Sequence, residues 1–212
     1  MLKSIIKKYI HHNIPPNLFW RFCHIFLNKK SNYLFEKSLK GYKKIYDEIL
    51  INSKFDVLLH VGCNTGDYGN YLSQKFKNKK VILNDINSKL FKYHNKLSSN
   101  FNFIEGDILK IKIPKADIVI CHTVLIYFKK VKFLKFINKV LDTDFSKLYL
   151  YEYFDNTYKY DFDNHVNIHS TKILIEFFQN RDFVIQEVKL DKKNFSIFQS
   201  SYIKLYLIKK YR

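Results

Sequence analysis

The sequence predicts an α/β fold whose core is a seven-stranded, mostly parallel, doubly wound sheet with an antiparallel terminal hairpin and an N-terminal helical cap. From residue 55 onward, short runs of β-branched and aromatic residues alternate with stretches in which apolar residues recur every three to four positions, a pattern typical of parallel sheets. The last two β-rich runs have no helical stretch between them, so one of them is expected to run antiparallel. We therefore expect a cap over residues 1–51 and a sheet domain over residues 52–212.

The cap is expected to be helical because apolar residues follow helical spacing through residues 1–51, with a break at two consecutive prolines. A helical layer that covers one edge of the domain is the simpler interpretation. The alternative is a basic helix at a membrane surface, in which Lys3, Lys7 and Lys8 face anionic lipid and the neighbouring isoleucines face the acyl chains.

Seven strands and four helices are expected in the sheet domain. The strands are Phe55–Val61, Val81–Ile86, Phe101–Ile104, Ala116–His122, Lys147–Tyr153, Phe183–Leu190 and Tyr202–Lys209. The helices are Tyr68–Phe76, Ser88–Leu97, Val131–Leu141 and Thr171–Gln179. Asp67 and Ser170 are expected to cap the first and the last of these helices.

The chain length and the net charge limit the classes of fold and partner that are possible. At 212 residues the chain is long enough for one hydrophobic core. Its net charge of +18 would favour an anionic partner such as nucleic acid. However, the chain has 34 lysines and only 3 arginines. More than half of it, 114 of the 212 residues, consists of five residue types with AT-rich codons: Ile, Asn, Lys, Phe and Tyr. Codon bias explains the lysine surplus, and nucleic-acid readers rely on arginine, so no nucleic-acid partner is expected.

The sequence indicates a cytoplasmic protein. Cys23, Cys63 and Cys121 are too few and too scattered for a disulfide framework, and no Cys or His cluster has zinc spacing, so no metal site is expected. No apolar stretch approaches the roughly 18 residues of a membrane span, and the first residues lack the apolar region of a secretory signal. Peripheral contact with the inner membrane face stays open, as does the oligomeric state.

The carboxyl ends of the first three strands carry the residues that point to a ligand. The first strand runs into a turn, residues 60–67 (HVGCNTGD), that leads directly into a helix and offers free backbone N–H groups. The second strand delivers Asp85, at a spacing suited to ribose hydroxyls. The third leads to Asp107 and Ile108, a second carboxylate beside an apolar residue that can flank a flat base. The three ends are expected to form one nucleoside site.

These residues resemble the cofactor-binding motifs of the class I S-adenosylmethionine-dependent methyltransferases, a Rossmann-like family, over about residues 55–210. The resemblance implies S-adenosylmethionine as cofactor, with Asp85 at the ribose and Asp107 at the adenine amino group. Ala116-Asp117-Ile118-Val119-Ile120 resembles the fourth strand of the family, and the terminal hairpin distinguishes it from NAD-binding folds. The cofactor residues implied in full are His60, Gly62, Cys63, Asn64, Gly66, Asp85, Ile86, Asp107, Ile108 and His122.

Two positions depart from the family pattern. His60 stands where an acid is usual, and Asn64 where a glycine is usual. Asn tolerates left-handed backbone conformations, so the turn is expected to survive. A neutral His60 can hydrogen-bond the amino group of the cofactor, whereas an imidazolium would repel it, so binding is expected to weaken at low pH.

Methyl transfer to a hydroxyl needs alignment, exclusion of water and a general base. His122, at the end of the fourth strand, is the first candidate for that base, and an ordinary edge histidine is its alternative. Glu152 on the fifth strand is the next candidate, with a solvated carboxylate as its alternative. His165 and His169 belong to the segment 153–170, which commonly lines the acceptor pocket in this fold, and ordinary loop polarity is the alternative for both.

The residues around His122 exclude several classes of methyltransferase. Cys121-His122-Thr123 lacks the acids of metal-dependent catechol-type enzymes, the Pro-Pro run of enzymes that act on base amino groups, and the Pro-Cys of cytosine C5 enzymes. We therefore expect an O-methyltransferase acting on a sugar, glycan or other small polar hydroxyl compound. The turn, residues 61–67, also looks similar to those of methyltransferases in polysaccharide biosynthesis. An RNA methyltransferase that uses the basic surface, and a degenerate methyltransferase fold that serves as a scaffold, remain as alternatives.

Overall fold

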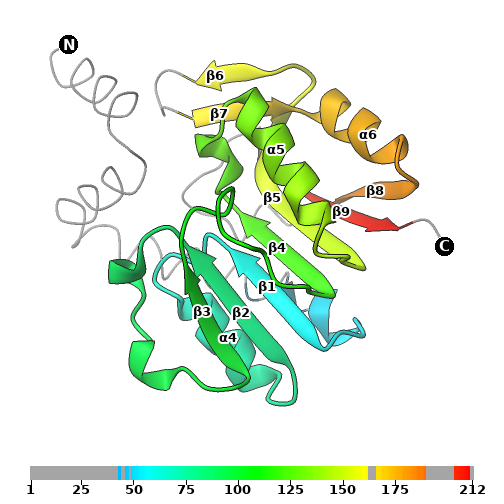
Figure 1. Ribbon diagram of the computed structural model, residues 1–212. Coiled ribbons are helices and arrows are strands. Elements are labelled where there is room, and N and C mark those ends of the chain that lie inside the picture. The colour runs from blue at the N-terminus through cyan, green and yellow to red at the C-terminus, as the bar shows by residue number, and fades with distance from the viewer. Residues whose placement is uncertain (1–42, 44–45, 48, 162–165, 190–202, 211–212) are drawn as a thin grey trace, which may run out of the picture.

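The computed structural model describes residues 43, 46–47, 49–161, 166–189 and 203–210, and its centre is a nine-stranded sheet (Figure 1). The first four strands lie in the order β3-β2-β1-β4, and β5 follows β4. The strands are β1 Val57–Val61, β2 Lys80–Asp85, β3 Phe101–Glu105, β4 Ile118–His122, β5 Lys147–Asp155, β6 Lys159–Asp161, β7 Val166–Ser170, β8 Phe183–Val188 and β9 Ile203–Lys210.

Strands β1 to β5 pair in parallel, and the two last strands form the predicted antiparallel hairpin. β9 pairs antiparallel with β5 over seven residues, from Lys147↔Lys209 to Tyr153↔Ile203, and β8 pairs antiparallel with β9. The α/β fold with a mostly parallel sheet and a terminal hairpin is thus confirmed. The parallel pairing brings the carboxyl ends of β1 to β4 to the same edge of the sheet (Figure 1).

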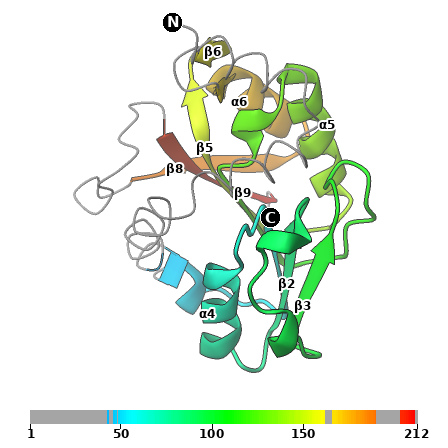
Figure 2. The same ribbon diagram turned by 90° about the vertical axis from the view of Figure 1, so that its left-hand side faces the viewer.

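Helices cover both faces of the sheet, as expected for a doubly wound fold (Figure 2). On one face, α4 (Asp67–Lys75) buries Tyr68 and Leu72 in a core with Leu58 and Ile120. On the other face, α5 (Lys130–Leu141) and α6 (Thr171–Gln179) pack on a second core formed with Val119 and other strand residues. The amphipathic spacing of these helices explains why each buries one stripe of side chains.

The structure corrects the number of strands. The segment Tyr153–Ser170 was expected to be a loop, but it contains β6 and β7. β7 pairs in parallel with the end of β5 through Phe154↔His169, and β6 pairs antiparallel with β7. The polar composition of these strands concealed them, because their pairing depends on partners elsewhere in the chain.

Two details of the predicted helices are also wrong. Ser88–Leu97 is not one helix but two 3-10 turns, η1 (Ser88–Leu90) and η2 (His94–Lys96), because the buried Phe91 between them stacks on Phe103 with ring centroids 4.4 Å apart. Asp67 is the first residue of α4, and its N-cap is Gly66. Ser170 caps α6 as predicted, since its hydroxyl accepts a hydrogen bond from the Ile173 amide.

Most of the expected cap lies outside the described residues. Of residues 1–51, the structure describes 43, 46–47 and 49–51, all helical, and Tyr46 and Leu50 are buried against the α4 face. The boundary at residue 51 stays a prediction. Across the described part of the chain, no helix is both long and apolar enough to cross a membrane.

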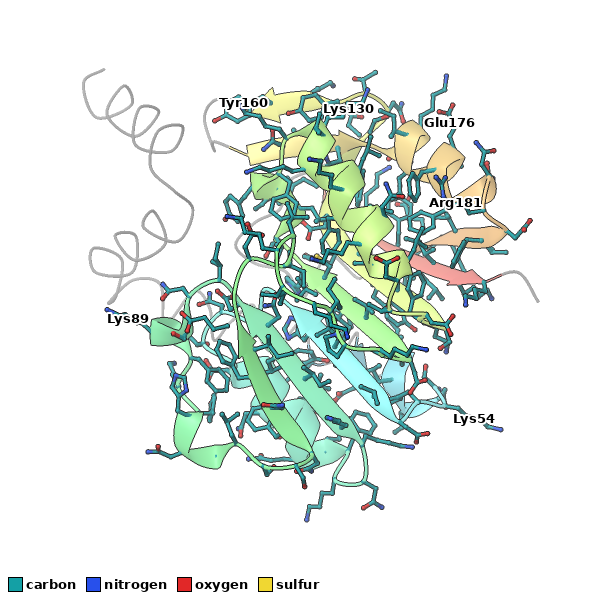
Figure 3. All side chains as sticks on the ribbon, viewed as in Figure 1. Lys54, Lys89, Lys130, Tyr160, Glu176 and Arg181 are labelled. Carbon is teal, nitrogen blue, oxygen red and sulfur yellow. The ribbon has the colours of Figure 1, made fainter. Side chains whose placement is uncertain are left out.

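Several charged side chains lie at the periphery. Lys54, Lys89, Lys130, Glu176 and Arg181 all point outward from the ribbon (Figure 3). The three labelled lysines thus lie at the surface, outside the two cores.

Candidate functional site

A cavity of about 300 Å³ lies at the shared carboxyl edge of β1 to β4. Its size is at the lower end of the range for small-molecule sites. All of the cofactor residues expected from the sequence line this cavity except Gly66, which lies at the start of α4. Predictions made from separate strand ends thus converge on one place in the structure.

The turn after β1 takes a conformation that requires glycine at Gly62. Its φ is 72°, and a Cβ there would lie 1.9 Å from Cγ2 of Val124. The amides of Gly62 and Cys63 both donate to the carbonyl oxygen of Asn84, at 2.8 and 3.0 Å. Asn64 has a φ of 52°, so the expected left-handed conformation occurs where the family usually has glycine.

The two predicted carboxylates lie on the same wall of the cavity. Asp85 accepts hydrogen bonds from the amides of Asn64 (2.8 Å, Oδ2) and Asn87 (3.0 Å, Oδ1), and burial raises its pKa. Asp107 uses Oδ1 to accept from the Leu109 amide at 2.9 Å. A carboxylate has about four lone-pair sites, so each group keeps capacity for a ligand hydroxyl or amino group.

Two histidines lie at the ends of the adjacent strands β1 and β4. Burial lowers the pKa of His60 to about 4, and burial together with His60 lowers the pKa of His122 to about 3. The Nδ1 atom of His122 lies 3.4 Å from the hydroxyl of Tyr46. Both imidazoles are therefore neutral at physiological pH, which is the state in which His60 does not repel a cationic ligand group.

Several polar residues of the cavity were not predicted from the sequence, among them Tyr68 and Asn84. Tyr68, on the first turn of α4, lines it with a buried hydroxyl. Asn84, one residue before Asp85, is buried and donates from Nδ2 to the carbonyls of Ile104 and Gly106, both at 3.0 Å, which fixes the β3 end against β2. Asn84 could have been found from the sequence, because it is a polar residue inside an otherwise apolar strand. Tyr68 could not, because the rotation of α4 about its axis decides where its side chain points.

Comparison with known proteins decides the class of this site. Residues 58–144 match the family model described as a methyltransferase domain. Residues 58–144 therefore form a methyltransferase domain, within a sheet that has the predicted class I methyltransferase fold. Every cavity-lining residue, from His60 to Lys132, falls within the matched segment.

Relatives and solved structures agree with the domain assignment. The chain is 26% identical over 117 residues to the malonyl-[acyl-carrier protein] O-methyltransferase of Calditerrivibrio nitroreducens, covering 49% of this chain and 45% of the relative, so it spans about half the length of that protein. The magnesium protoporphyrin IX methyltransferase of Synechocystis, crystallised with S-adenosylmethionine, shares the fold with a TM-score of 0.64 and 18% identity, covering 98% of this chain and 96% of that one.

A plantazolicin methyltransferase crystallised with S-adenosylhomocysteine gives a TM-score of 0.65 at 13% identity, covering 96% of this chain and 94% of that one. These comparisons confirm the predicted methyltransferase fold, and the two solved structures hold S-adenosylmethionine or S-adenosylhomocysteine. The methyltransferase domain also has residues suited to this cofactor, since two acids and several buried polar atoms line the cavity.

The wall of the methyltransferase cavity beyond β4 is formed by Thr123, Val124, Tyr127 and Phe128. Thr123 has a φ of 51°, which is rare for a β-branched residue, and its amide donates to the carbonyl of Tyr151 at 2.9 Å. The short helix η3 (Leu125–Tyr127) follows. Strain at this position accompanies a sharp turn that directs the chain from the strand end along the cavity.

Glu152 does not line the cavity of the methyltransferase domain, and it is not a solvated carboxylate either. It lies within β5, is 0% exposed, and its Oε1 accepts from the Val124 amide at 2.8 Å and from the Cys121 thiol at 3.3 Å. Burial raises its pKa to about 7. Its position supports a role in holding the backbone behind the wall and not contact with an acceptor.

His169 is likewise placed away from the cavity. It is 1% exposed, its Nε2 donates to the Leu125 carbonyl at 2.7 Å, and its ring stacks on Phe133 with centroids 4.1 Å apart. Neighbouring Asn167 donates from Nδ2 to the carbonyl of Ile126 at 2.9 Å. The position of His169 does not support the predicted role as base, and His165, the other candidate from this segment, lies outside the described residues.

Proposed function

We propose that the protein is an S-adenosylmethionine-dependent O-methyltransferase that acts on a small polar hydroxyl compound, with a sugar or glycan as the favoured class. The observation that carries the proposal is the cavity at the ends of β1 to β4, which Asp85, Asp107 and two neutral histidines line together. The acceptor class has less support, because none of the residues that the structure describes in the segment 153–170 lines the cavity.

The proposed cofactor residues fall into two groups, acids that accept hydrogen bonds and apolar residues that pack on the base. Asp85 would accept hydrogen bonds from the ribose hydroxyls and Asp107 from the adenine amino group, while Ile86 and Ile108 would pack on the base. S-adenosylmethionine supplies a methyl group on a sulfonium sulfur, an electrophile that an oxygen can attack in line. The remaining tasks of the chain are to align the acceptor, to exclude water and to receive a proton.

The wall after β4 supports an acceptor that presents both hydroxyls and apolar faces. Tyr127 and Phe128 offer rings against which a pyranose face can pack, and Thr123 offers a hydroxyl. His122 lines the same cavity and is neutral, so it can accept a hydrogen bond from an acceptor hydroxyl. Its low pKa makes it a weak base, so alignment is expected to contribute more to the rate than proton abstraction.

The test begins with calorimetric titration of S-adenosylhomocysteine at pH 7.5. Binding is expected, and its absence would favour the scaffold alternative. The protein is then incubated with methyl-labelled S-adenosylmethionine and either nucleotide sugars with polysaccharide or total RNA. Label in the carbohydrate pool supports the proposal, whereas label in RNA, with an RNA affinity that falls steeply with salt, would overturn the acceptor class.

A variant pair then tests the role of His122. His122→Ala should lower the rate of label transfer, whereas His94→Ala, which changes an exposed histidine outside the cavity, should leave it unchanged. Equal rates for the two variants would remove His122 from the mechanism.

Membrane contact through the N-terminal helix is a separate part of the proposal. It is supported by the sequence pattern alone, since Lys3, Lys7 and Lys8 lie outside the described residues. Flotation with anionic vesicles should recover the full chain and not a chain lacking residues 1–13. Equal recovery of both would contradict membrane contact.

A further inference from the structure

Three buried polar atoms of cavity-lining residues have no hydrogen-bond partner among the described residues, and one of them is Oδ1 of Asn64 in the turn after β1. The other two are Nδ1 of His60 and the hydroxyl of Tyr68, whose residues are 5% and 6% exposed. Both residues line the cavity, and their rings are perpendicular to each other with centroids 5.7 Å apart. Buried polar groups are nearly always paired, so two unpaired groups on one cavity wall indicate a ligand that satisfies them.

The order of the strands fixes which part of the ligand these atoms meet. Asp107 and Asp85 follow the ends of β3 and β2, and His60 lies at the end of the next strand, β1, beside Tyr68 of α4. If the adenosine of the cofactor lies along the two carboxylates, as the proposed function requires, its amino-acid end extends toward β1. That end carries an α-ammonium group, which only donates hydrogen bonds, and an α-carboxylate, which only accepts them.

The protonation states of the two side chains suit both of these groups. Burial lowers the pKa of His60 to about 4 and raises the pKa of Tyr68, so at neutral pH one is a neutral imidazole and the other a neutral phenol. Each can donate one hydrogen bond and accept another. The lining acids of the cavity are Asp85 and Asp107, so β1, β4 and α4 supply no carboxylate to bind the ammonium group.

We propose that His60 and Tyr68 form a neutral subsite that hydrogen-bonds the α-amino and α-carboxylate groups of S-adenosylmethionine, replacing the acid that methyltransferases of this class usually carry at the position of His60. The inference rests on the proposed function, because it assumes that the cavity holds this cofactor. It adds a recognition residue, Tyr68, and it assigns to His60 a role shared between the two charged groups of the ligand.

The test compares two ligands that differ at the amino-acid end. S-adenosylhomocysteine carries this end, and 5′-methylthioadenosine lacks it. Calorimetry at pH 7.5 is carried out with the full chain and with His60→Phe and Tyr68→Phe, which keep a ring but remove the polar atoms. Each variant should bind S-adenosylhomocysteine roughly tenfold more weakly and methylthioadenosine with an affinity within about twofold of the parent.

Tyr71→Phe is the matched control on the same helix. The Tyr71 hydroxyl donates to Asp47 and does not line the cavity, so this variant should bind both ligands as the parent does. Thermal unfolding of each variant shows whether the fold is retained. If His60→Phe does not fold, Tyr68→Phe still carries the test, because it removes a single hydroxyl.

The outcomes separate the two levels of the proposal. A parent chain that prefers S-adenosylhomocysteine, with a preference that both variants lose, supports the subsite. A preference that neither variant changes, or a parent that binds both ligands equally, overturns the subsite and leaves the cofactor assignment intact. A parent that binds neither ligand overturns the proposed function, and the subsite with it.

Discussion

The imidazole of His169 donates to the carbonyl oxygen of Leu125 at 2.7 Å, and it thereby joins β7 to the short helix that forms the cavity wall. Glu152 binds the amide of Val124 one residue earlier, and Asn167 binds the carbonyl of Ile126 one residue later. Three consecutive residues of the wall are therefore held through their backbone by buried polar side chains from β5 and β7. These side chains set the position of Tyr127 and Phe128.

His169→Ala should destabilise the protein by about 2–4 kcal/mol, because it removes both a buried hydrogen bond and a stacked ring. Urea unfolding at pH 7.5 measures this difference. His94→Ala, at an exposed histidine, should cost well under half as much. Similar stabilities for the two variants would show that His169 does not hold the wall.

Glu152→Gln should change stability in a pH-dependent way. The pKa of Glu152 is raised from 4.5 to about 7 in the folded state, so folding favours the protonated form and stability is lost as pH rises through this interval. An amide does not titrate. Between pH 5 and pH 8, the variant should therefore gain about 2 kcal/mol in free energy of unfolding relative to the parent.

The control for this measurement is Glu176→Gln, at an exposed carboxylate on α6. Its stability should follow that of the parent at all pH values. Parallel pH curves for Glu152→Gln and the parent would mean that the buried carboxyl has an ordinary pKa.

Asp85→Asn should weaken binding of S-adenosylhomocysteine by at least roughly tenfold. Both carboxylate oxygens accept from backbone amides, those of Asn64 and Asn87, and a side-chain amide can accept only through its one oxygen. The turn after β1 loses one of its supports and the ribose loses its acceptor. Calorimetry tests this, with Asp56→Asn at an exposed residue as control, and an affinity within twofold of the parent would contradict the assigned role.

Gly62→Ala should destabilise the protein for two separable reasons. A φ of 72° costs a non-glycine residue about 1–2 kcal/mol, and the new methyl group would collide with Val124. In a chain that already carries Val124→Ala, only the backbone penalty should remain. The double-mutant cycle in urea should therefore show a coupling of about 1 kcal/mol or more, and additive effects would exclude the collision.

The sequence was sufficient where local pattern and tertiary structure agree. The helix Thr171–Gln179 occurs with the predicted limits, since an amphipathic stripe follows a serine cap. The cofactor cavity could be predicted because parallel strands bring their ends to one edge, whatever the details between them.

The sequence was insufficient where contacts with distant parts of the chain decide which side chains are buried and where they point. β7 contains His169 and Asn167, and only its pairing with the end of β5 shows that these polar side chains face inward. Glu152 lies between two tyrosines on β5, and the sequence does not tell that both faces of this strand are buried. Tyr68 follows a predicted helix start, yet its direction depends on how α4 packs against the sheet.

The segment matched to the methyltransferase family ends at residue 144, and the side chains that hold the wall, Glu152, Asn167 and His169, all come after it. Under the proposed function, the residues that line the donor site lie within the matched segment, whereas the side chains that hold the acceptor wall come after it. Substitutions in β5 and β7 could alter substrate choice while the donor site stays constant. Related chains could then differ in the acceptor that they methylate and keep the same methyl-transfer reaction.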